Sequence, residues 1–133
     1  MTHPELIFTA ASGVAAMTWL SLVASLFAAK FRPWIWLATG IVIPASFAIA
    51  YIMLLASGWG ASPGGGFGSI GEVRTLFAND AALTAGWLHY LAFDLFVGTW
   101  IAREGLDKGV MRILLIPCLL LTFIFGPEGR LMC

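Results

Sequence analysis

The chain alternates between long apolar runs and short polar or glycine-rich segments. Four runs are long enough to cross a hydrocarbon core about 30 Å thick, which needs about 20 residues of helix. They predict membrane-spanning helices over residues 6–29, 34–57, 81–102 and 109–125, of which the last is the shortest. We therefore expect an all-α integral membrane protein, with one transmembrane domain covering residues 1–133.

Short connections join the first predicted span to the second and the third to the fourth, which predicts a four-helix bundle of two antiparallel hairpins. Gly126-Pro127 is a typical stop signal for the last helix. The two short turns carry most of the basic residues of the chain: Lys30, Arg32, Arg103, Lys108 and Arg112. The opposite side has only Arg74 and Arg130. Basic residues concentrate on the cytoplasmic side of membranes, so both termini are expected to face away from the cytoplasm.

The segment between the two hairpins contains a GxGxxG pattern, formed by Gly66, Gly68 and Gly71. A dinucleotide-binding site would need this pattern between a strand and a helix, and a P-loop would need a following GK[ST]. Neither context exists here, so the pattern indicates a flexible loop. Apolar side chains then recur at helical spacing: Ile70, Val73, Leu76 and Phe77. This spacing predicts a short amphipathic helix lying at the membrane interface.

The composition supports a membrane protein and excludes several classes of function. Hydrophobic residues make up 60% of the 133-residue chain and charged residues 11%, against about 25% charged in soluble domains. The net charge is zero and there is no basic run for nucleic acid or an anionic lipid surface. Cys118 and Cys133 form no CxxC motif, which favours two separate thiols over a redox pair or a metal site.

The third predicted span carries His89 and Asp94 near its middle. An Asp at the centre of a spanning helix costs roughly 2.5–3.5 kcal/mol on insertion scales, so such residues usually face a bundle interior and have a function there. Five residues apart on a helix, the two side chains diverge by about 140°. Tyr90 is instead one turn before Asp94 on the same face, and this stripe continues to Gly98.

Dry surroundings favour the neutral form of a carboxyl group, and a neutral carboxylic acid beside a ligand is a ready general acid. Asp94 is therefore a catalytic candidate, and the less favoured alternative is a structural tie to a free carbonyl or a hydroxyl of another helix. Pro44 and Pro117 leave helical carbonyls unpaired within two spans, and the resulting kinks would open space at this depth. This space is either a binding cavity or a feature of helix packing without a site. Only His3 accompanies His89, which disfavours a bis-histidine haem, and no metal site is expected.

Residues 86–101, Gly-Trp-Leu-His-Tyr-Leu-Ala-Phe-Asp-Leu-Phe-Val-Gly-Thr-Trp-Ile, resemble the hallmark of a known membrane family. This is the abscisic-acid-deficient-4-like, or neoxanthin-synthase-like, family of plants, algae and bacteria. The stretch over residues 117–129, which closes in Phe-Gly-Pro-Glu-Gly, is similar to a second family motif. Length and the four-span plan also agree. One departure is Thr99, where the family often has Arg; Arg103 follows one turn later.

The resemblance implies a membrane protein of carotenoid biosynthesis. Plant members are required to form neoxanthin from violaxanthin, an isomerisation of an epoxide to an allene. A bacterial member, in the inner membrane, would act on another carotenoid or isoprenoid. In this reading Asp94 is the acid, His89 the base and Tyr90 the group that orients Asp94. The ligand would pack along Trp87, Phe93, Phe96 and Gly98. No cofactor is needed.

Two other functions use the same residues. A non-enzymatic pigment-binding or accessory subunit of a larger membrane complex would hold a carotenoid or chlorophyll unchanged, with His89 as a ligand and Asp94 as a structural tie. A small proton-coupled transporter would use Asp94 to carry protons. The expected partners are a hydrophobic carotenoid ligand and the lipid bilayer. Four short helices make a thin shell, so a homo-oligomer or a membrane-complex partner is also expected.

Overall fold

The computed structural model describes residues 2–125, and all regular structure in that part of the chain is helical. The elements in chain order are α1 (His3–Ser25), α2 (Arg32–Leu37), the π-helical segment η1 (Ala38–Val42), α3 (Ile43–Gly60), α4 (Ile70–Phe77), α5 (Asp80–Asp107) and α6 (Arg112–Phe125). The prediction of an all-α protein is confirmed over these residues.

Three helices are long and apolar enough to cross a membrane. They are α1, the continuous helix Arg32–Gly60 formed by α2, η1 and α3, and α5, with 23, 29 and 28 residues. Helix α6 is apolar but shorter, with 14 residues. At 1.5 Å per residue its described part is about 21 Å long, less than the thickness of a hydrocarbon core.

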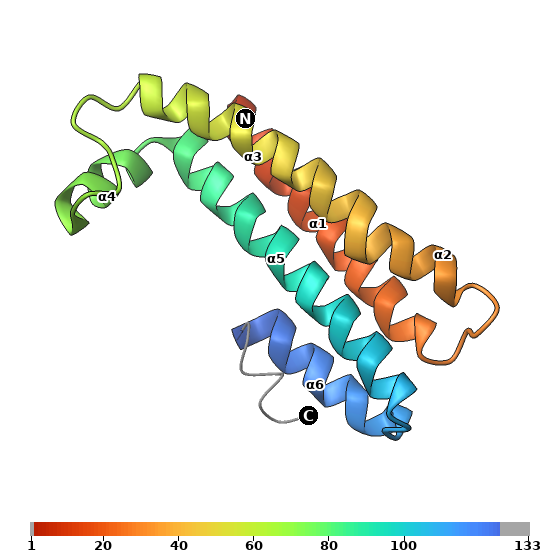
Figure 1. Ribbon diagram of the computed structural model, residues 1–133. Coiled ribbons are helices and arrows are strands. Elements are labelled where there is room, and N and C mark those ends of the chain that lie inside the picture. The colour runs from red at the N-terminus through yellow and green to blue at the C-terminus, as the bar shows by residue number, and fades with distance from the viewer. Residues whose placement is uncertain (1, 126–133) are drawn as a thin grey trace.

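Helix α5 is the centre of the molecule, because α1, α3 and α6 all pack against it. Figure 1 shows the three long helices side by side, with α6 against the lower half of α5 and α4 projecting from the upper end. The α1–α2 and α5–α6 turns lie at the same end, away from the N-terminus. The hairpins predicted by the sequence therefore place the basic residues of both turns at one end of the bundle.

Hydrogen bonds from Arg32 close the turn between α1 and α2. Its Nε donates to the carbonyl of Ser25 at 3.0 Å and its Nη2 to the carbonyl of Leu26 at 3.1 Å. Both carbonyls belong to the C-terminal end of α1, where they have no partners within the helix. The arginine thus stabilises the reversal of the chain as well as contributing charge.

The kink expected at Pro44 takes the form of a π-helical turn. Proline has no N–H, so the carbonyl of Gly40 loses its usual partner four residues later. The chain adjusts with a wider turn over η1, in which the N–H of Ile43 donates to the carbonyl of Ala38, five residues earlier. Such single π turns are frequent at functional sites. Here it brings Thr39, which is buried, against α5.

The glycine-rich loop before α4 packs around the carboxylate of Glu72 and does not form a phosphate-binding loop. Ser69 caps α4 by accepting from the N–H of Glu72 at 3.2 Å. The carboxylate of Glu72 in turn accepts from the N–H of Gly68 at 3.0 Å. A Cβ at Gly66 would lie 2.7 Å from this carboxylate, so the glycines permit its close approach. The predicted short helix is confirmed, with Leu76 as its buried side chain, and its location at the membrane interface stays a prediction.

Several details differ from the sequence expectations. Helix α5 continues to Asp107, beyond the expected end at residue 102, because its last turn packs on α6: a Cβ at Gly105 would clash with Leu115. Cys118 is disulfide-bonded, so the expectation of a separate thiol is wrong for this residue. The predicted helix end at Gly126-Pro127, and the positions Arg130 and Cys133, lie outside the described residues.

Candidate functional site

Asp94 lies in the middle of α5 and faces the bundle interior. Its side chain is only 5% exposed. Tyr90, one turn earlier, is its hydrogen-bonding neighbour, as the spacing of the two residues predicts. The other carboxyl oxygen, Oδ2, is buried and has no hydrogen-bond partner. Buried polar atoms are normally paired, so an unpaired carboxyl oxygen at this depth marks a candidate ligand-binding atom.

Tyr90 connects this carboxyl group to α6. Its hydroxyl donates to the carbonyl of Phe123 at 3.3 Å. That carbonyl lies between one and two turns after Pro117, near the C-terminal end of α6 as described. The position of Tyr90 between Asp94 and Phe123 therefore depends on how α6 packs on α5.

Trp19 of α1 completes the group of residues around Asp94. Its indole lies over Gly98, where a Cβ would be 2.5 Å from the ring carbon Cη2, and its ring centroid is 5.4 Å from that of Phe123. The indole is 6% exposed, and its Nε1 has no hydrogen-bond partner. Trp19, beside Gly98, thus carries an unpaired donor at its Nε1, and the Oδ2 of Asp94 is an unpaired acceptor one turn earlier on the same face of α5. We call Trp19, Tyr90, Asp94, Gly98 and Phe123 the Asp94 cluster.

Sequence reasoning missed Trp19 as part of this cluster. It lies 75 residues before Asp94, and its depth within the first span is equally typical of packing. The available signal was Gly98, because a glycine on the face of Asp94 leaves room for one large side chain from a neighbouring helix. Which helix supplies that side chain depends on the packing.

His89 lies on a different face of α5, outside the Asp94 cluster. It is exposed, and its ring contacts Tyr51 of α3 at a centroid distance of 5.3 Å and Phe93 at 6.5 Å. Phe93 is 59% exposed and Phe96 56%. The structure does not bring His89 and Asp94 to a common cavity. Phe93 likewise points outward, whereas Gly98 is buried against Trp19.

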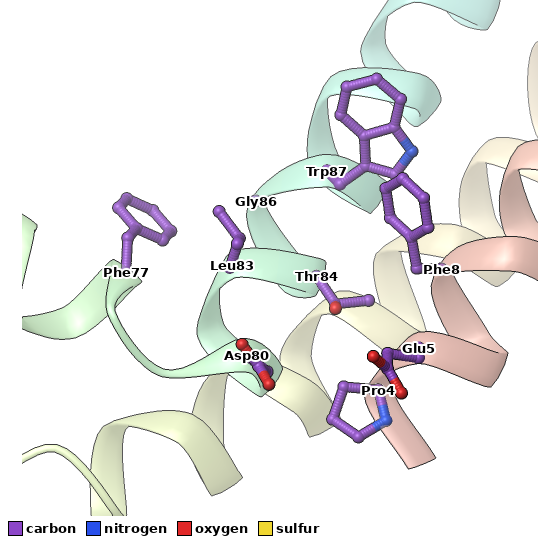
Figure 2. A pocket seen from close by; sticks show the side chains of 9 residues that line it. All are labelled: Pro4, Glu5, Phe8, Phe77, Asp80, Leu83, Thr84, Gly86 and Trp87. Atoms are coloured by element: carbon purple, nitrogen blue, oxygen red, sulfur yellow. The ribbon is translucent and has the colours of Figure 1, made fainter. Parts of the chain in front are cut away.

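Trp87 lines a cavity of about 520 Å³ near the N-terminal end of α1. Figure 2 shows this cavity between α1, α5 and the C-terminal end of α4, with Phe8 and Trp87 on one side and Phe77 on the other. The Nε1 of Trp87 donates to Ser12 Oγ at 2.9 Å, and its ring centroid is 5.4 Å from that of Phe8. Two carboxyl side chains, Glu5 and Asp80, border the cavity.

A second cavity of about 700 Å³ lies at the opposite end of the bundle, between the helix Arg32–Gly60 and α5. Phe96 and Thr99 both line it. The aromatic residues expected to follow one ligand are thus divided: Trp87 belongs to the first cavity and Phe96 to the second. Within residues 2–125, no three His, Cys, Asp or Glu side chains form a group that could hold a metal ion.

Over residues 2–125, these features define an all-helical protein with three helices suited to a membrane, which enclose the buried and partly unpaired carboxyl group of Asp94. The family model described as ABA DEFICIENT 4-like matches residues 6–132, which is nearly the whole chain. The chain belongs to this family. No curated protein and no solved structure matches it.

Proposed function

We propose that this protein converts a carotenoid or related isoprenoid within the bilayer, with Asp94 as the acid–base group. Family membership supports a carotenoid-related role. The observation that carries the proposal is the buried Oδ2 of Asp94, which has no partner although Tyr90 engages the same carboxyl group. A carboxyl group held in this way has one oxygen fixed and one oxygen whose hydrogen-bonding capacity is unmet.

A single carboxyl group can serve as both the acid and the base of an epoxide isomerisation. The acid gives its proton to the epoxide oxygen and the C–O bond opens. A proton must then leave carbon as the new double bond forms, and the carboxylate just produced is a base that can accept it. The net change is zero protons and zero electrons, so the reaction needs no external acid, base or redox partner.

This proposal assigns His89 no part in the proton transfer, in contrast to the sequence hypothesis in which His89 is the base. Its ring lies on the outer face of α5, tilted against Tyr51 and stacked with Phe93, whereas Asp94 faces inward. Tyr90 and Trp19 take its place as residues that surround the reacting group. The Nε1 of Trp19, a buried donor without a partner, is suited to hold a ligand oxygen.

The test is turnover of an added xanthophyll epoxide by the purified full-length chain in lipid nanodiscs, followed by chromatography of the extracted pigment. Asp94→Asn keeps the shape of the side chain but removes its acid–base function, so conversion should fall by about 10²-fold or more. Asp107→Asn, at an exposed position at the end of α5, is the matched control and should keep conversion. Full activity of Asp94→Asn would refute the proposed role of Asp94.

The alternative is a pigment-binding subunit, and one observation favours it. Tyr51, His89 and Phe93 form a row of ring contacts across α3 and α5 on the outer face of the bundle. A polyene lying along this row would be bound without meeting Asp94. The absorption spectrum and lipid extract of the purified protein distinguish the two: stoichiometric unmodified pigment, retained by Asp94→Asn, would support the subunit over the enzyme.

We also propose that α6 belongs to a fourth span, and that the end carrying both short turns is cytoplasmic. Lys30, Arg32, Arg103 and Lys108 all lie in or beside those turns, and basic residues are retained on the cytoplasmic side. Cysteine labelling in intact cells tests this: Ile70→Cys in α4 should react with a membrane-impermeant reagent, and Lys108→Cys should react only after permeabilisation. The reverse pattern would overturn the orientation.

A further inference from the structure

We propose that the cavity beside η1 binds an anionic phospholipid, whose phosphate lies between Arg32 and Arg103 and whose acyl chain lies along the apolar wall. The cavity has a volume of about 700 Å³ and is open to the outside of the bundle between the helix Arg32–Gly60 and α5. One end of the cavity is basic and the rest of its wall is apolar. These two parts match the anionic headgroup and the acyl chain of a phospholipid.

The basic end consists of two arginines from distant parts of the sequence, placed around one indole. The guanidinium carbons of Arg32 and Arg103 each lie 5.6 Å from the ring centroid of Trp36. Trp36 is itself fixed, because its Nε1 donates to Ser25 Oγ at 3.2 Å. Cation–π contacts orient a guanidinium group but leave its N–H donors free for an anion.

Within the described residues, no carboxylate forms an ion pair with either arginine. Among residues 2–125 there is one ion pair, between Lys108 and Glu104 at 2.8 Å, so the acidic residue next to Arg103 is already engaged. Arg32 uses its Nε and Nη2 on the carbonyls of Ser25 and Leu26 and keeps its other donors. Arg103 is exposed and donates to no described group. The unmet charge favours an anion, and basic pockets between membrane helices are typical sites for lipid phosphates.

The remaining walls are apolar and aromatic, as an acyl chain requires. Leu37, Ile41, Phe96 and Trp100 line the cavity beyond the arginines. Leu37, Ile41 and Phe96 are strongly exposed, so a chain in this position would cover surface that faces the membrane. The basic end belongs to the same end of the bundle as both short turns. The ends of membrane-spanning helices lie at the level of the lipid headgroups.

The experiment uses the detergent-purified full chain and native mass spectrometry, with phosphatidylglycerol, phosphatidylcholine or inorganic phosphate as the probe. We expect phosphatidylglycerol to remain bound at a higher level than phosphatidylcholine. Arg103→Gln should lower that retention by about fivefold, the effect of one basic residue near a membrane surface. Arg112→Gln removes the same charge at the same end of the bundle but outside this cavity, and should change little.

A second test concerns the apolar wall of the cavity. Phe96→Ala should weaken retention of phosphatidylglycerol, because the acyl chain loses a contact, without creating affinity for phosphatidylcholine. Equal retention of the two lipids, or equal losses in Arg103→Gln and Arg112→Gln, would overturn the proposal. Complete displacement of the lipid by millimolar inorganic phosphate would also overturn it in favour of a free-phosphate site. Because Asp94 is not involved, these results are independent of the proposed catalysis.

Discussion

The indole of Trp19 rests directly on Gly98. A Cβ added at Gly98 would lie 2.5 Å from Cη2 and 2.9 Å from Cζ3 of the indole, closer than real side chains approach one another. The indole is buried and is also held by Phe123 of α6, so it has little room to move. Gly98 therefore sets the distance between α1 and α5 at the level of the Asp94 cluster.

Gly98→Ala should destabilise the protein by about 1–3 kcal/mol, the usual cost of overpacking a filled interface. Thermal unfolding in a fixed detergent measures this. Gly13→Ala is the matched control, since Gly13 also lies within a helix but has no atom within 4 Å of its added Cβ. That substitution should stabilise the helix by about 0.5–1 kcal/mol. Equal effects of the two substitutions would contradict the close contact between Trp19 and Gly98.

A hydroxyl pair ties the π-helical segment to α5. The hydroxyl oxygens of Thr39 and Thr99 lie 2.7 Å apart, and that of Thr99 is also 2.8 Å from the carbonyl of Leu95. Thr99→Val keeps the shape but leaves a buried hydroxyl of Thr39 unpaired, at a cost of about 1 kcal/mol.

A double-mutant cycle with Thr39→Val tests this pair, because the doubly substituted protein should lose less stability than the two single losses combined. Thr9→Val, whose hydroxyl bonds only within α1, should show no coupling with Thr99→Val. Strict additivity between positions 39 and 99 would argue against an energetically important hydroxyl contact.

Substitutions at His89 and Tyr90 separate the proposed reaction from the hypothesis of a His89 base. His89→Phe keeps the ring contacts with Tyr51 and Phe93 but removes every titratable atom, and most of the conversion should remain. Tyr90→Phe removes the hydroxyl that engages Asp94, and conversion should fall about tenfold, the equivalent of one hydrogen bond. Unfolding temperatures of both variants serve as the control for folding. Loss of conversion in His89→Phe alone would restore the histidine as a reacting group.

Glu72 should determine how well the glycine-rich loop before α4 is held. Glu72→Ala removes the acceptor of the Gly68 N–H, and this exposed loop should open more often. Limited proteolysis in detergent should then cut the loop near Phe67 several times faster than in the unsubstituted protein. Arg74→Ala, an exposed substitution in the same helix, is the control. Equal cleavage rates would show that Glu72 does not organise the loop.

The sequence predicted well those features that depend on local periodicity. Apolar runs of sufficient length define α1, the helix Arg32–Gly60 and α5, because a helix in lipid satisfies its own backbone groups wherever it packs. The spacing of Ile70, Val73 and Leu76 likewise predicts α4. The closeness of Tyr90 to Asp94 follows from one turn of one helix. None of these features depends on which other helix packs nearby.

Features that depend on packing between helices could not be read from the sequence. His89 and Asp94 are equally central in the same apolar run, yet one lies outside the bundle and the other inside, because α1, α3 and α6 approach different faces of α5. Arg32 and Arg103 form no basic run, so the sequence shows no anionic lipid site. Only the contact of the helix Arg32–Gly60 with α5 places both around Trp36.

By itself, the sequence determined that the chain is helical, suited to a membrane and a member of one family, since length, hydropathy and motifs are properties of consecutive residues. The tertiary structure decided which side of α5 is the interior. That choice assigns Asp94, Gly98 and Trp19 to a common interface and leaves His89, Phe93 and Phe96 on the outer surface. The physical reason is that polar and small side chains along one helix acquire their environment from the other helices.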